Sequence, residues 1–140
     1  MSMLSALSSH VDQEGELLQR LNDAVLSVQA AVLGDMELLG ITDDKLEKAS
    51  VILVEFLEKL KSALNSTTND PTVSMLVENI RYDSDKPVEE WEEDIQSLID
   101  SLKSGKLNGD PSLLSIIEDI LNLLNADYST AVKALYFRYR

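Results

Sequence analysis

Hydrophobic residues recur at steps of three and four along most of the chain, the spacing of one face of an α-helix. The first stripe comprises Leu4, Leu7, Val11, Leu18, Leu21, Val25, Val28 and Val32. This is the spacing of a heptad seam, interrupted only at Glu14. We expect either one long helix over this stripe or two helices that separate near Gly15, because glycine weakens a helix interior.

The remaining helices are predicted from capping residues, prolines and glycines. Asp70-Pro71 and Asp110-Pro111 each place an N-cap carboxylate before a proline at the first helical position. Together with the apolar stripes, such signals predict helices over residues 43–64, 71–82, 87–105, 111–124 and from Asp127 onward. The helix over 111–124 is apolar on more than one face and is expected at the centre. The fold class that follows is all-α, with about six helices in a compact bundle.

Two parts of the chain resemble each other at an offset of 40 residues. Residues 70–80 match 110–120, and four of nine compared pairs are identical. Helix pairs of about 40 residues are the building blocks of HEAT-like and armadillo-like solenoids. The similarity also has a simpler explanation, because helix starts and aliphatic stripes look alike by necessity. We therefore expect one domain over residues 1–140, and two helix-pair repeats, over 43–82 and 85–125, remain an open alternative to a plain bundle.

Composition and charge narrow the range of functions. The chain has 140 residues, no cysteine, one histidine and a formal net charge of −13. Thiol catalysis and disulfide scaffolds are excluded, and no metal or other cofactor is predicted. The negative charge argues against nucleic acid and anionic membranes as partners. No apolar run reaches the roughly 20 residues of a membrane span, so a cytoplasmic protein is expected.

The residues that could do chemistry form no catalytic motif. Ser9 and His10 are neighbours in sequence, so their side chains diverge on any regular helix or strand. The segment from Asp83 to Asp94 has the length of a calcium loop, but Val88 stands where that loop needs glycine. We predict that the protein is not an enzyme and has no catalytic residues.

Two segments are candidates for binding a protein partner. The first is acidic and comprises Glu89, Glu90, Glu92 and Glu93, although acids in the first turns of a helix also complement its dipole. The second is aromatic and basic and comprises Tyr136, Phe137, Arg138 and Tyr139, although these aromatics could instead pack on the preceding helix. Trp91 shares a stripe with Ile95 and is interpreted as a core residue.

Abundant helix without catalytic motifs predicts a non-catalytic, acidic protein-protein interaction module: an adaptor, assembly chaperone or inhibitor whose partner has a basic surface. The alternative is an enzyme or small-ligand binder that uses carboxylate and Tyr side chains in a pocket between helices. The seam of the first helix also predicts a homodimer, although the same seam could pack on the chain's own helices.

Overall fold

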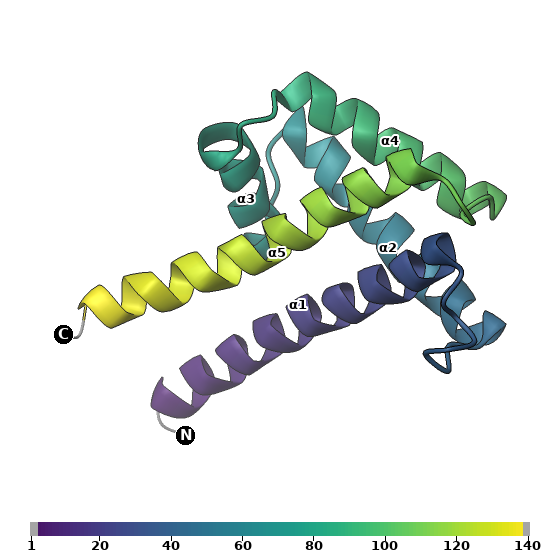
Figure 1. Ribbon diagram of the computed structural model, residues 1–140. Helices are drawn as coiled ribbons and strands as arrows, with labels where there is room; N and C mark the ends of the chain where they lie inside the picture. Colours follow the sequence, from purple (N-terminus) through teal and green to yellow (C-terminus); the bar gives the residue numbers. More distant parts are fainter. Residues whose placement is uncertain (1–2, 139–140) are drawn as a thin grey trace.

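The computed structural model describes the backbone of residues 3–138 and the side chains of residues 17–125. This described part is all-helical and contains no strand. The elements are α1 (Met3–Leu33), α2 (Asp43–Leu64), α3 (Pro71–Glu78), the π-helix η1 (Asn79–Asp83), α4 (Val88–Ser104) and α5 (Pro111–Arg138). In Figure 1, α1 and α5 run next to each other, and α2, α3 and α4 pack around them in a compact arrangement.

The all-α prediction is confirmed, but the described part has five α-helices instead of about six. The break that was expected at Asn125, Ala126 and Asp127 is absent, because α5 continues through it to Arg138. None of these three residues is proline or glycine, so the backbone donors are kept, and the weak preference of Asn and Asp for helix ends does not stop the helix. Gly15 likewise does not divide α1, which is one helix of 31 residues.

Side chains cap the starts of three helices, and the caps predicted at Asp70 and Asp110 are confirmed. Thr42 Oγ1 accepts a hydrogen bond from Lys45 N at the start of α2. Asp70 Oδ1 accepts from the backbone of Thr72 at the start of α3, and Asp110 does the same for Ser112 at the start of α5. Gly105 ends α4 with φ of 76°, a left-handed conformation that glycine adopts without strain.

The helix predicted over 71–82 differs at its end, where α3 widens into the π-helix η1. In this turn Ile80 is buried while Tyr82 remains exposed. The guanidinium of Arg81 donates a hydrogen bond of 2.8 Å to the carbonyl of Leu64, the last residue of α2. The wider turn is thus joined to the C-terminal end of α2, which a cation also stabilises through the helix dipole.

The core is mostly aliphatic, with Phe56 and Trp91 as its aromatic members, and draws on all five α-helices. Leu21, Val25, Val28 and Val32 from the predicted seam of α1 are 0–2% exposed within the chain's own core. The part of the seam from Leu21 to Val32 is therefore not available to a second chain. The side chains of Leu4, Leu7 and Val11, in the other part, lie outside the described residues. α5 packs against α1, α3, η1 and α4, while α2 packs against α1, α3 and α4, so α5 is no more central than α2.

The two helix pairs of the proposed repeat have connections of equal length. The loop from α2 to α3 spans residues 65–70 and the loop from α4 to α5 spans 105–110, each ending in the aspartate that caps the next helix. The second helices differ, since α3 has 8 residues and α5 has 28. The repeat therefore stays a prediction.

Among the described residues, no helix combines the length and the apolar character that crossing a membrane requires.

Candidate functional site

The connection between η1 and α4 forms one wall of a surface hollow. Ser84 leaves η1 in an extended conformation, with ψ of 140°. Pro87 is the N-cap of α4, one position earlier than the first helical residue that was predicted for it. Its carbonyl accepts from the backbone N–H groups of Glu90 and Trp91, so the first turn of α4 is closed by backbone bonds alone.

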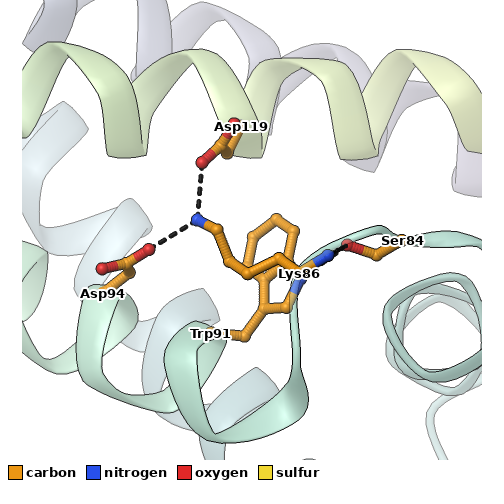
Figure 2. A network of polar contacts seen from close by, with 5 residues as sticks. All are labelled: Ser84, Lys86, Trp91, Asp94 and Asp119. Atoms are coloured by element: carbon orange, nitrogen blue, oxygen red, sulfur yellow. Dashed lines mark hydrogen bonds and ion pairs between the residues drawn. The ribbon is translucent and has the colours of Figure 1, made fainter.

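Lys86 lies in the segment that connects η1 to α4, and its side chain contacts both α4 and α5 (Figure 2). Its ammonium nitrogen lies 2.5 Å from a carboxylate oxygen of Asp94 on α4 and 2.5 Å from one of Asp119 on α5. The same nitrogen lies 4.6 Å from the centre of the Trp91 ring, within the range of a cation–π contact. One side chain thus joins the connecting segment to the helix that follows it, α4, and to α5, which is distant in sequence.

Ser84 completes this group of contacts. Its hydroxyl oxygen accepts hydrogen bonds from the indole N–H of Trp91, at 2.9 Å, and from the backbone N–H of Lys86, at 3.1 Å. Trp91 is only 4% exposed, as predicted for a core residue, and its single polar atom has a partner. We call Ser84, Lys86, Trp91, Asp94 and Asp119 the Lys86 network.

The charge of Lys86 is set by two opposing effects. Burial of the side chain lowers its pKa, whereas the hydrogen bonds to Asp119 and Asp94 and their negative charges raise it. The two carboxylates prevail, so the pKa of Lys86 lies above its ordinary value of 10.5. The ammonium group remains protonated at neutral pH and is unsuited to act as a nucleophile or general base, which needs a lowered pKa.

The hollow beside this network has a volume of about 560 Å³. Its polar lining consists of Asn79, Asp83, Ser84, Asp85, Asp119 and Asn122, together with Lys86 itself. The ammonium group of Lys86 is already paired, whereas Asp83 and Asp85 are exposed and form no ion pair within the described part of the chain. The lining is therefore rich in hydrogen-bond acceptors and carries negative charge.

The acidic segment predicted to bind a partner begins beside this hollow. On α4, Glu89, Glu90 and Glu93 are exposed and Glu92 is half-buried. None of the four forms an ion pair with another described residue, whereas Asp94 is bound by Lys86. The four glutamates follow Asp83 and Asp85 closely in the sequence, and we call these six residues the α4 acidic face.

The second predicted segment cannot be placed in the same way. The side chains of Tyr136, Phe137, Arg138 and Tyr139 lie outside the described residues. His10 does so as well. Among residues 17–125, no three acidic or histidine side chains are arranged to hold a metal ion.

Sequence reasoning missed the roles of Lys86 and Asp119. One signal was present, because Lys86 is the only basic residue between Arg81 and Lys103 and stands within a run of acids. A single cation in such a run is expected to form an ion pair. Its second partner, however, is 33 residues away on α5, and only the packing of α5 against α4 brings it close.

No family model, curated protein or solved structure matches this chain.

Proposed function

We propose that the protein is a non-catalytic interaction module that binds a partner with a basic surface through the α4 acidic face. The observation that carries this proposal is the pairing pattern on and beside α4. The network around Lys86 uses Asp94 and Asp119, while Asp83, Asp85, Glu89, Glu90 and Glu93 are exposed without an ion pair in the described part. Unpaired acids on a fixed surface attract a basic partner and speed its encounter.

The rigidity of this surface supports the proposal. The Lys86 network joins the connection to α4 and α5, and Trp91 fixes α4 in the core. The acids that flank these residues are consequently held on an ordered backbone, which reduces the entropy lost on binding. In this proposal the protein is an acidic, cytoplasmic adaptor, assembly chaperone or inhibitor, and neither nucleic acid nor a membrane is its partner.

Catalysis in the hollow is less well supported. Lys86 is protonated and paired on two sides, and the carboxylates around it do not converge on an unpaired cation or histidine among the described residues. An enzyme of this kind would need a group with a pKa shifted toward neutrality, and Lys86 is shifted away from it. A binding role needs only the negative charge and the shape of the surface.

Two finer features belong to the same proposal. We propose that the helix pairs over 43–82 and 85–125 are a repeat, because their six-residue loops both end in an aspartate cap. A homodimer through α1 would have to use the part of the seam before Leu18, since Leu21 to Val32 pack inside the chain.

The proposal is tested with octalysine as the basic probe. Replacing Glu89, Glu90 and Glu93 with glutamine should weaken binding several-fold at low salt, because local charge is lost from the α4 acidic face. The matched control replaces Asp23, Glu47 and Glu55, three exposed acids on α1 and α2, with their amides and changes the net charge equally. It should weaken binding less than twofold. Equal losses in the two variants would contradict the proposal, because net charge alone would then explain the binding.

A further inference from the structure

The turn between α1 and α2 exposes two adjacent leucines. Leu38 is 83% exposed and Leu39 is 63% exposed, and Leu33 at the end of α1 is 52% exposed. A single leucine on a surface is common, but neighbouring leucines of this exposure form an apolar projection. In Figure 1 this turn lies at the opposite end of the molecule from η1 and the start of α4.

The backbone of this turn is fixed by hydrogen bonds at both ends. After α1, Gly34 N donates to Ala31 O and Asp35 N to Ala30 O, the pair of bonds of a Schellman motif. After one further helical turn, Gly40 N donates to Glu37 O and Ile41 N to Met36 O, which repeats the motif. Gly34 and Gly40 have φ of 76° and 69°, the left-handed conformation that each motif needs.

Contacts with the rest of the molecule hold the turn in place. Met36 packs against the core. Gly109 N, in the loop before α5, donates a hydrogen bond of 2.9 Å to the carbonyl of Val32 at the end of α1. Thr42 then caps α2 directly after the turn. Leu38 and Leu39 are thus presented on an ordered backbone, so binding through them does not require a loop to become ordered.

The charges around the leucines indicate the chemistry of the occupant. Residues 34–48 contain five acids, Asp35, Glu37, Asp43, Asp44 and Glu47, and two lysines, Lys45 and Lys48, of which Lys48 pairs with Asp44. Two copies of the chain that met here would bring these acids face to face, which disfavours a symmetric dimer. An apolar surface flanked by lysine or arginine complements both the leucines and the acids.

We infer that the Leu38–Leu39 turn docks on an amphipathic helix of a partner protein. Leu38 and Leu39 insert between leucines of the partner helix. The basic residues of that helix lie against Asp35, Glu37 and Asp43 of this chain. This surface is separate from the α4 acidic face, so either proposal can fail alone. The apolar face of an amphipathic helix carries residues at steps of three and four, and a leucine of a neighbouring element can insert between them as a knob in a hole.

The probe for this inference is a 14-residue amphipathic helical peptide of leucine and lysine, added to the full-length, ¹⁵N-labelled protein. The expected result is saturable shifts of the amide signals concentrated in residues 33–41. The Leu38→Ser/Leu39→Ser variant should bind the peptide at least tenfold more weakly. The matched control is Leu26→Ser/Val51→Ser, which changes residues that are 48% and 55% exposed elsewhere and should change the affinity less than twofold.

Several results would overturn the inference. A peptide with alanine in place of leucine that binds equally well would show attraction by charge alone. Shifts confined to α4, or an affinity that the Leu38→Ser/Leu39→Ser variant leaves unchanged, would place the peptide elsewhere. If the amide signals of residues 33–41 shift with protein concentration in the absence of peptide, the turn binds a second copy of the chain. If phosphatidylcholine vesicles shift the same signals, the turn binds lipid.

Discussion

Lys86 contacts two helices and an aromatic ring with a single side chain, which makes it the residue where local change should have the widest effect. The side chain is 17% exposed, and those of Asp94 and Asp119 are 26% and 36% exposed. An exposed ion pair contributes little to stability, whereas disruption of a buried one leaves an uncompensated charge in the interior. The partly buried Lys86 pairs should have an effect between these two cases.

Replacing Lys86 with methionine should lower the free energy of unfolding by roughly 1–3 kcal/mol, because Asp94 and Asp119 lose their shared cation while the apolar stem over Trp91 is kept. Urea denaturation measures the loss. Lys103→Met is the control, since its pair with Glu58 is exposed on both sides and should contribute at most about 0.5 kcal/mol. An equal effect of the two substitutions would mean that the Lys86 network does not stabilise the fold.

The pH dependence of this contribution follows from the raised pKa of Lys86. Because the folded-state pKa lies above 10.5, the stabilisation is fully present below pH 10.5 and is lost as the pH rises through the folded-state value. The difference in unfolding free energy between the wild type and Lys86→Met should therefore be constant from pH 7 to pH 9 and decrease only in more alkaline solution. A difference that disappears near neutrality would refute the pairing.

Among the elements, α3 is the shortest α-helix and depends most on its start. Asp70 accepts from the backbone N–H groups of Thr72 and Val73, and Pro71 occupies the first position. Asp70→Ala should lower the free energy of unfolding by about 1 kcal/mol, whereas Asp70→Ser retains an acceptor and should lower it by less. Equal losses for alanine and serine, measured by thermal unfolding, would exclude capping as the cause.

The seam of α1 gives a second prediction for a single helix. Leu21 and Val25 are 2% and 0% exposed, so Leu21→Asp/Val25→Asp places two carboxylates in the core and should prevent folding. Leu17→Asp, at a position on the same helix that is 38% exposed, should remain folded. Circular dichroism and light scattering would measure both variants. A folded monomer with both core positions charged would mean that the seam belongs to an interface between chains.

Sequence patterns predicted elements better than connections. Asp70 and Asp110 cap their helices where they were expected to, because caps depend on local geometry. The break after Leu124 was wrong, since polar residues allow a helix to end without requiring it. The π-helix at the end of α3 had no local signal. The acidic part of the site was visible as a run of glutamates, but its link to Asp119 depends on tertiary packing.

Across the whole molecule, acidic residues outnumber basic ones about two to one. The chain has 25 acidic and 12 basic residues. In the described part, the ion pairs are formed by Lys86, Lys48 and Lys103, and none of them involves Glu89, Glu90, Glu92 or Glu93. Such a charge distribution acts mainly on the rate of association and weakens as salt screens it.

The most direct test is the association rate constant for fluorescein-labelled octalysine, measured by stopped flow at 0.1 M and 1 M salt, where the Debye length falls from about 10 Å to about 3 Å. We expect the rate constant of the wild type to fall at least tenfold. Because the glutamates on α4 account for much of the attraction, Glu89→Gln/Glu90→Gln/Glu93→Gln should start lower and fall less. A rate constant indifferent to salt, or an identical fall in the variant, would contradict an electrostatic role for the α4 acidic face.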